Sequence, residues 1–320
     1  MKIYVDDGST SIKVKWDGGK GVEKKIAVPT AFKRGWKADF GNSNIVNYDI
    51  DGEKYSFDRH DSTALNTNNI EWQYSAANTI AVHHALLKTG IEPKTIDIVV
   101  TLPLSEYYDT NKQVNKENVQ RKKSSLMRRV RNSKETQMFK LNAITVRPES
   151  IPAGFEILSE MDLNQSLLIV DIGGTTLDIS QISGQMTDVI NIYGDPHTGV
   201  SLITEEVKNA LIEAKTYASN HMADLFIINR KNHDFFDKNI NIPAKIQRVK
   251  ETIESANRRL NERVIDSIRQ FKGYSHVMVI GGGSEIISQE IKDFCNVRHN
   301  RFFVSSHPQF DLVNGLFTMG

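Results

Sequence analysis

The sequence predicts an α/β protein made of two similar halves. Its 320 residues exceed the length of a typical single domain, so two domains, each with its own apolar core, are expected. An internal repeat supports this division, because residues 3–20 align with residues 168–185. A third observation is the run 281–283, three glycines between a buried-strand pattern and the start of a helix. Together these observations indicate a duplicated fold.

Composition excludes several classes of function. The 40 basic and 39 acidic residues leave a formal charge of +1, which gives no general attraction to DNA or anionic lipid. Cys295 is the single cysteine, so an intrachain disulfide and a clustered cysteine metal site are excluded. The first residues show no export signal, and no apolar run approaches the roughly 20 residues of a membrane-spanning helix. We therefore expect a cytoplasmic protein without membrane contact or direct nucleic acid binding.

Each copy of the repeat predicts a β-hairpin with a polar bend. The aligned pairs are Val5 with Val170, Asp6 with Asp171, Gly8 with Gly173, and Thr10 with Thr175. Alternating apolar residues on both sides of each bend predict two strands. A single copy would be explained by turn chemistry, since Asp-Gly and Gly-Gly supply the positive φ of tight turns. The duplication favours two facing bends whose hydroxyls and backbone N–H groups hold one phosphate chain.

The glycine run lies between two predicted elements. Residues 277–280 have the pattern of a short buried strand, and Ser284 is a capping residue for the following helix. Three glycines allow the backbone to approach a ligand closely. The run is not a Walker loop, because no Gly-Lys-Ser/Thr follows, and an ordinary strand-to-helix loop is the alternative.

A long amphipathic helix is predicted near residues 246–271. Apolar residues recur there at intervals of three and four, which defines one helix face. They are Ile246, Val249, Ile253, Ala256, Leu260, Val264, Ile268 and Phe271. We expect this face to pack in the core rather than to form a coiled coil.

These motifs, in this order, resemble the nucleotide-binding loops of the actin, heat-shock chaperone and sugar kinase superfamily. Residues 6–10 resemble its first phosphate loop, residues 171–176 its second, and residues 280–283 its adenosine loop. The turn 194–199 is similar to the glycine turn that follows the second phosphate loop and leads into a helix. The resemblance implies an actin-like, ribonuclease H-like fold of two domains. Each would have a large and a small subdomain around a nucleotide cleft.

Within this superfamily the chain resembles the ParM/StbA plasmid segregation proteins. The stretches that carry this resemblance are 32–34, 70–75, 101–104, 148–154 and 311–315. The resemblance extends over essentially the whole chain. It implies a plasmid-encoded bacterial protein that polymerises with ATP and pushes plasmid copies apart. The implied partners are further copies of the chain and a separate DNA-binding adaptor on the plasmid centromere.

The resemblance also implies domain boundaries. Domain I is expected at residues 1–160, with a small subdomain at about 30–70. Strand-like pieces and turn residues, rather than helical periodicity, occur in that small subdomain. Domain II is expected at 161–307, with a helical small subdomain at about 195–270. A C-terminal helix at about 308–320 is expected to pack back on domain I.

Acidic residues around a triphosphate require a counter-ion. A close unscreened pair of negative charges costs on the order of 4 kcal/mol at an intermediate dielectric. Mg²⁺ prefers oxygen ligands and keeps its waters, so we expect ATP, with GTP as the alternative, bound with hydrated Mg²⁺ and no dedicated cage. Asp6 and Asp171, at equivalent repeat positions, are the candidates for orienting metal-bound waters. Asp7 is the alternative to Asp6.

The resemblance implies that Glu149 orients the attacking water, between a strand pattern at 143–146 and a helix near Ser150. An acidic residue that stabilises the helix N-terminus is the alternative. The catalytic candidates are Glu149, Asp171, Asp6 and Asp7. The nucleotide-binding candidates are Gly8, Ser9, Thr10, Lys13, Gly173, Gly174, Thr175, Thr176, Gly199, Gly281, Gly282 and Gly283. For Lys13, a solvated strand lysine is the alternative.

A basic run at 121–134 has three interpretations. We favour a solvated surface, while a contact between filament subunits and direct DNA binding are the alternatives, the last of which predicts a steep salt dependence. The main alternative function for the chain is a small-molecule kinase of the same fold. It is disfavoured because many small sugar kinases carry a zinc cluster of several cysteines. A chaperone-type switch would need a substrate-binding domain, and a shape-determining cytoskeletal protein an amphipathic anchor. We expect neither.

Overall fold

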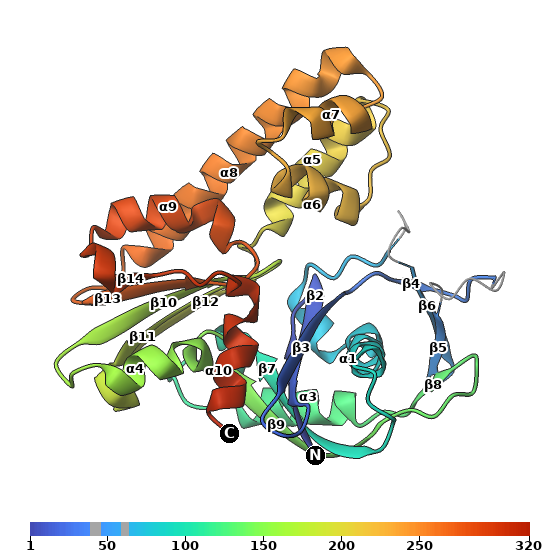
Figure 1. Cartoon of the computed structure of the whole chain (residues 1–320), viewed down its shortest axis with the longest axis horizontal. Helices are drawn as coiled ribbons and strands as arrows, with labels where there is room; N and C mark the ends of the chain where they lie inside the picture. The colour runs from blue at the N-terminus through green and yellow to red at the C-terminus, as the bar shows by residue number, and fades with distance from the viewer. Residues whose placement is uncertain (39–45, 59–63) are drawn as a thin grey trace.

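The computed structural model describes residues 1–38, 46–58 and 64–320. Residues 39–45 and 59–63, within the predicted small subdomain at 30–70, lie outside the described residues. The described strands form two five-stranded sheets and one four-stranded sheet (Figure 1). Helices pack against all three sheets, which confirms the predicted α/β class.

The first large sheet has the strand order β3-β2-β1-β7-β9. Its strands are β1 (Lys2–Asp7), β2 (Ser11–Asp17), β3 (Glu23–Pro29), β7 (Thr95–Leu102) and β9 (Lys140–Pro148). The first three are antiparallel neighbours, whereas β7 runs parallel to β1 and to β9. The first predicted hairpin is therefore present as β1–β2.

The second large sheet repeats this topology in the order β12-β11-β10-β13-β14. Its strands are β10 (Ser166–Ile172), β11 (Leu177–Ser183), β12 (Val189–Asp195), β13 (His276–Ile280) and β14 (Phe302–Phe303). Three strands again form an antiparallel meander, and β13 is parallel to β10 and β14. The duplicated fold predicted from the repeat is confirmed.

The small sheet has the order β4-β6-β5-β8. Its strands are β4 (Phe32–Arg34), β5 (Val46–Ile50), β6 (Glu53–Phe57) and β8 (Val130–Asn132). Helix α1 (Ala76–Lys88) packs between this sheet and the first large sheet (Figure 1). Ten of its residues are buried, which explains why α1 has little polar face.

The second half carries most of the long helices. They are α5 (Ser201–Glu213), α6 (Asn220–Ile228), α7 (His233–Asn239), α8 (Ile246–Ile268) and α9 (Ser284–Cys295). The predicted helix is confirmed as α8, whose buried residues include Val249, Ile253 and Leu260. Its apolar face packs in the same core as α5 and the second large sheet. Figure 1 shows α5, α6 and α7 gathered at one end of α8.

The remaining elements are short, apart from one helix of eleven residues, α3. They are α2 (Leu104–Tyr107), α3 (Lys116–Leu126), α4 (Phe155–Glu160), α10 (Asp311–Thr318), and the 3₁₀ helices η1 (Ile70–Tyr74), η2 (Ile151–Gly154), η3 (Gly184–Met186), η4 (Pro243–Lys245), η5 (His299–Arg301) and η6 (Pro308–Phe310). Helix α10 returns to the first large sheet, where Val313 and Leu316 pack with Tyr4. Gly315 lets α10 pack closely on η2, because a Cβ there would overlap the Pro152 carbonyl.

Among the described residues, no helix combines the length and the apolar character needed to cross a membrane.

Candidate functional site

A cleft of about 340 Å³ is lined by residues from both halves of the chain. The predicted residues that line it are Asp6, Gly8, Ser9, Thr10, Lys13, Glu149, Asp171, Gly173, Gly174, Thr175, Thr176, Gly281 and Gly282. The cleft thus brings together the bends of both hairpins and the glycine run that were predicted separately. Gly199 and Gly283 are not part of the lining. A Cβ at Gly199 would lie 2.5 Å from the Gly174 carbonyl oxygen, so this glycine lets the segment before α5 pack behind the second bend.

The two bends approach each other closely. Ser9 Oγ lies 2.6 Å from Thr175 Oγ1, although 166 positions separate the two residues in the sequence. A Cβ at Gly174 would overlap the Thr10 side chain. None of Gly8, Gly173 and Gly174 has a positive φ, whereas Gly281 has a φ of 87°. At Gly174, close approach of the bends rather than turn conformation therefore accounts for the glycine.

Three carboxyl groups, those of Asp6, Glu149 and Asp171, are buried in the walls of the cleft. Asp6 has an ion pair with Lys13, with 3.2 Å between Oδ2 and Nζ. Burial raises the pKa of Asp6 despite the opposing charge of Lys13. Burial, followed by the neighbouring charge of Asp178, holds the pKa of both Glu149 and Asp171 well above the usual range. The cleft wall therefore has an excess of acidic groups over basic ones.

This donor set fits a hydrated divalent cation. Carboxylate oxygens are the ligands that Mg²⁺ prefers, and the like charges of Asp6, Glu149 and Asp171 would be relieved by a cation near them. Among the described residues, no group of three or more His, Cys, Asp or Glu side chains is arranged to hold a metal directly.

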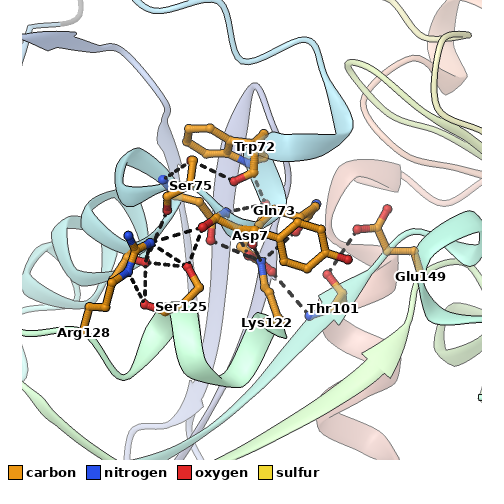
Figure 2. Close-up of polar contacts among 12 residues, drawn as sticks. Asp7, Trp72, Gln73, Ser75, Thr101, Lys122, Ser125, Arg128 and Glu149 are labelled. Carbon is orange, nitrogen blue, oxygen red and sulfur yellow. Dashed lines mark hydrogen bonds and ion pairs between the residues drawn. The ribbon is translucent and has the colours of Figure 1, made fainter. Parts of the chain in front are cut away.

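Asp7 is not part of the cleft lining and is fully buried. Figure 2 shows it beside Lys122. Its Oδ2 forms an ion pair with Lys122 Nζ and accepts a hydrogen bond from Asn78 Nδ2 at 3.0 Å. Its Oδ1 accepts a hydrogen bond from the Thr101 N–H at 3.4 Å. Both carboxylate oxygens thus have protein partners, and this placement favours Asp6 over Asp7 as the residue that faces a bound cation.

The basic run at 121–134 is only partly a solvated surface. Lys122 has no exposed area, and Arg128 donates to the Tyr74 carbonyl and to Ser125 Oγ, 3.2 and 2.7 Å away. Sequence reasoning missed Lys122. A signal existed, because Val119, Lys122 and Leu126 follow the spacing of one helix face, and Leu126 is fully buried.

Glu149 follows β9 at the point where the two halves meet. Its Oε1 accepts a 3.4 Å hydrogen bond from Thr101 Oγ1, and its N–H donates to the Leu102 carbonyl at 2.8 Å. The next residue, Ser150, has a φ of 68°, and its Oγ lies 2.7 Å from Ser180 Oγ in the second half. A positive φ is costly for serine, so surrounding contacts hold this segment in place.

Asp178 also links the halves, and sequence reasoning missed it. Its Oδ1 accepts a hydrogen bond from the Leu104 N–H at 2.7 Å, at the start of α2. Burial raises the pKa of Asp178 to about 7. The repeat contains the signal, because Asp178 occupies the position that corresponds to Lys13.

Helix α6 supplies a further wall that the motifs did not predict. Its residues Asn220, Asp224 and Ile227 line the cleft, together with Ser219 before the helix. Asp224 Oδ1 accepts a 2.8 Å hydrogen bond from Thr204 Oγ1, and burial raises the pKa of Asp224 to about 6. This wall combines apolar and polar groups, as small-molecule sites commonly do.

Solved structures with low sequence identity share this fold. A non-polymerisable quadruple mutant of the pCBH ParM is 17% identical, with a TM-score of 0.74 over 100% of this chain and 98% of that one. A 15-stranded ParM filament from Clostridium botulinum is 18% identical, with a TM-score of 0.74 over 99% and 98%. The archaeal actin homologue Ta0583 in complex with ADP is 16% identical, with a TM-score of 0.70 over 98% and 97%. The fold is therefore actin-like.

Family models cover nearly the whole chain. Residues 1–160 match the model described as plasmid segregation protein ParM, N-terminal, and residues 161–319 match the model described as plasmid segregation protein ParM, C-terminal. Among curated proteins, none matches the chain. The two hairpins, the cleft between them and both family matches lead to one conclusion: the chain belongs to the ParM family of plasmid segregation proteins.

Proposed function

We propose that the chain is a Mg²⁺-dependent ATPase that polymerises with bound ATP and moves plasmid copies apart, its filaments losing stability after hydrolysis. The observation that carries this proposal is the convergence of both hairpin bends and Glu149 on one cleft. The ADP complex of the archaeal actin homologue and the ParM filament support it by analogy. Further copies of the chain are thus the first partner.

The residues of the cleft divide into three roles. Backbone N–H groups and hydroxyls of the two bends hold the phosphate chain, and Lys13 adds a positive charge. Asp6 and Asp171 orient the waters of the cation, which neutralises the triphosphate when bound. Glu149 orients the attacking water. Burial and the charges of the neighbouring carboxyl groups raise the pKa of Glu149, which makes its carboxylate a stronger base toward that water.

Closure of the cleft is the proposed link between nucleotide and assembly. A ligand shifts a conformational equilibrium only if it binds one state more tightly than the other. Ser9 and Thr175 touch each other across the cleft, so a terminal phosphate held by both bends would favour the closed arrangement. Hydrolysis removes that bridging group and with it the preference for the closed state.

The remaining features are proposals from family membership and the resemblance. A DNA-binding adaptor on the plasmid centromere connects the filament to its cargo, and the protein acts in the cytoplasm. Domain I comprises residues 1–160 with the C-terminal helix, and domain II comprises 161–307. ATP is the proposed nucleotide and GTP the alternative, which competition between the two in a binding assay will decide.

Light scattering with parallel measurement of phosphate release tests the proposal. With Mg²⁺ and ATP, we expect scattering to rise and then decay, and with a slowly hydrolysed analogue we expect it to persist. Scattering that never rises with any nucleotide, despite ATP turnover, would contradict filament formation and favour a kinase of the same fold.

The variant Glu149→Ala tests the catalytic assignment. It should bind ATP and assemble, but hydrolyse it about 100-fold more slowly, because a positioned base contributes on that order. Filaments of this variant should therefore outlast those of the wild type. Wild-type phosphate release from Glu149→Ala would exclude the proposed role of Glu149.

A further inference from the structure

Gln73 is a cleft residue that the proposed function does not use. It lies in η1 with 5% of its area exposed, and it is part of the cleft lining. Its side-chain Oε1 accepts a hydrogen bond from Lys122 Nζ at 2.7 Å, and its backbone carbonyl accepts another from the same atom at 2.8 Å (Figure 2). Lys122 thus donates to both the backbone and the side chain of Gln73.

The chemistry of lysine fixes the orientation of the Gln73 amide. An ammonium group can only donate hydrogen bonds, so the atom of the amide that faces Lys122 must be the oxygen. The NH₂ group is then directed away from Lys122. In the described part of the chain, no residue accepts a hydrogen bond from Gln73 Nε2. Gln73, which lines the cleft, therefore has an unpaired donor, Nε2, whose orientation is fixed by Lys122.

Lys122 itself is held rigidly. Besides its two contacts with Gln73, its Nζ forms the buried ion pair with Asp7 and donates to Asn78 Oδ1 at 3.2 Å. The Lys122 side chain has no exposed area. Burial lowers the pKa of Lys122, while the charge of Asp7 and its hydrogen bond oppose that shift. Each of these partners of Nζ is an accepting oxygen atom, so Nζ acts as a donor and does not accept a hydrogen bond from a rotated amide.

The ion pair of Asp7 and Lys122 is also connected to Glu149, the proposed catalytic residue, through a second set of hydrogen bonds. Asp7 accepts from the Thr101 N–H, and Thr101 Oγ1 donates to Glu149 at 3.4 Å. Figure 2 shows both sets of contacts, with Gln73 beside Lys122 and Glu149 beyond Thr101. The buried ion pair of Asp7 and Lys122 is therefore connected to two cleft residues. They are Gln73 and Glu149.

We propose that Gln73 donates a hydrogen bond to an oxygen at the reacting end of the nucleotide, and that Lys122 is the positioning residue that keeps this donor aimed into the cleft. The acceptor is either a terminal-phosphate oxygen or the attacking water held by Glu149. This inference rests on the proposed ATPase function. It assigns Asp7 a supporting task, which is to keep Lys122 charged.

The variant Gln73→Met tests the donor, since methionine has a similar length but no amide. We expect kcat for ATP hydrolysis to fall about tenfold, the usual effect of losing one hydrogen bond to a charged group, while ADP affinity stays at the wild-type value. Weaker binding of a slowly hydrolysed ATP analogue would identify the phosphate oxygen as the acceptor. Unchanged analogue affinity with the same loss of kcat would identify the water.

The variant Gln73→Glu separates the donor from its anchor. Glutamate keeps an oxygen for Lys122 but replaces the NH₂ group with a second acceptor, so the fold should persist while kcat falls at least as far as in Gln73→Met. Gln120→Met is the matched control. Gln120 is exposed on α3 outside the cleft, and the variant has the same substitution as Gln73→Met. Its kcat should equal that of the wild type.

Lys122→Met tests the positioning role. Without the cation the Gln73 amide can rotate, so kcat should fall about as far as in Gln73→Met, and the double variant should lose no more than either single one. If Lys122→Met does not fold, Asp7→Asn with Lys122→Met removes both charges of the pair.

Wild-type kcat and analogue affinity in both Gln73 variants, alongside slow hydrolysis in Glu149→Ala, would overturn the inference and leave the proposed function intact. A wild-type protein that does not hydrolyse ATP would overturn both.

Discussion

The two hairpins at the cleft share a backbone but differ at one cross-strand position. In β1–β2 Asp6 lies opposite Lys13, and in β10–β11 Asp171 lies opposite Asp178. The first pair is an ion pair with 3.2 Å between its charged atoms. The second pair places two buried carboxyl groups across from each other. Of the two hairpins, the first alone supplies a positive charge to the cleft at this position.

The difference follows from what each residue contacts. Lys13 lines the cleft, where a phosphate chain is proposed to bind. Asp178 instead accepts a hydrogen bond from the Leu104 N–H in the other half of the molecule. One copy of the repeat thus uses this position to balance charge in the cleft, whereas the other uses it to connect the halves.

The bends differ for a related reason. Ser9 and Gly174 are equivalent in the repeat, and they face each other's hairpins. Ser9 contributes a hydroxyl close to Thr175, while a side chain at 174 would overlap Thr10. The repeat therefore predicts the common backbone, but the side chain at each position depends on the neighbour across the cleft.

The largest expected effect comes from Asp178→Asn, which removes one carboxyl group of the facing pair Asp171 and Asp178. Burial raises the pKa of Asp178 to about 7, so between about pH 4 and pH 7 the folded protein holds a proton that the unfolded chain releases. Wild-type stability should therefore fall as pH rises through this window. The asparagine of the variant stays neutral and keeps an oxygen for the Leu104 N–H. The variant's gain in the free energy of unfolding should be near zero at pH 4 and on the order of 4 kcal/mol at pH 8.

Urea unfolding of both proteins at pH 4 and pH 8, without nucleotide or Mg²⁺, measures this difference. The comparison between variant and wild type cancels most of the contributions of the other buried carboxyl groups, which are present in both. A gain of the same size at both pH values would mean that Asp178 is ionised throughout, and the two hairpins would then differ less than proposed.

The second prediction compares the equivalent aspartates. Asp171→Ala should lower ATP hydrolysis about 100-fold, because groups that orient metal-bound waters contribute up to that much. Asp6→Ala should lose less, since it also frees Lys13 to interact with phosphate. Phosphate release measured over a range of Mg²⁺ concentrations tests this order. Equal losses would show that the ion pair with Lys13 does not distinguish the two carboxylates.

Local patterns were sufficient to predict the hairpins, the glycine run and α8. Each depends on residues close together in the sequence: alternation for the strands, glycines between a strand and a helix for the loop, and spacings of three and four for α8. The prediction that Ser284 caps the helix was wrong, because the N-cap residue of α9 is Gly283 and Ser284 is the first residue of the helix. The repeat then placed Asp6 and Asp171 at equivalent positions. The α/β fold could therefore be predicted without knowledge of any distant contact.

Other parts of the site depend on contacts that no local pattern encodes. All of β1 except Lys2 is buried, so both faces of the strand are covered and alternation cannot tell whether Asp6 or Asp7 faces the cleft. Lys122 contacts Asp7 and Gln73, which are 115 and 49 positions away. The spacing of Val119, Lys122 and Leu126 indicates which helix face Lys122 lies on, but it does not identify the distant partners of Lys122.

The third prediction concerns the closeness of the bends. Gly174→Ala should introduce an overlap with Thr10, which costs about 2 kcal/mol when a packed contact is overfilled. Opening of the cleft relieves that overlap, so ATP affinity should fall about 30-fold. Gly8→Ala is the matched control in the other hairpin, where the added Cβ would lie 3.2 Å from the Ser11 carbonyl oxygen and requires only a small shift. Equal affinity of the two variants would exclude closure as the reason for Gly174.

The smallest expected effect comes from Lys13→Met, which removes the charge that distinguishes the first hairpin. ATP affinity should fall about tenfold, the usual effect of losing one charge-assisted hydrogen bond, and AMP affinity should change less because Lys13 is proposed to contact the phosphate chain. Lys24→Met, on the exposed strand β3, is the control and should bind both nucleotides normally. The contrast between ATP and AMP separates two roles for Lys13. If both affinities stay unchanged, Lys13 serves to balance Asp6, and the two hairpins differ in how the fold is held together rather than in how they bind phosphate.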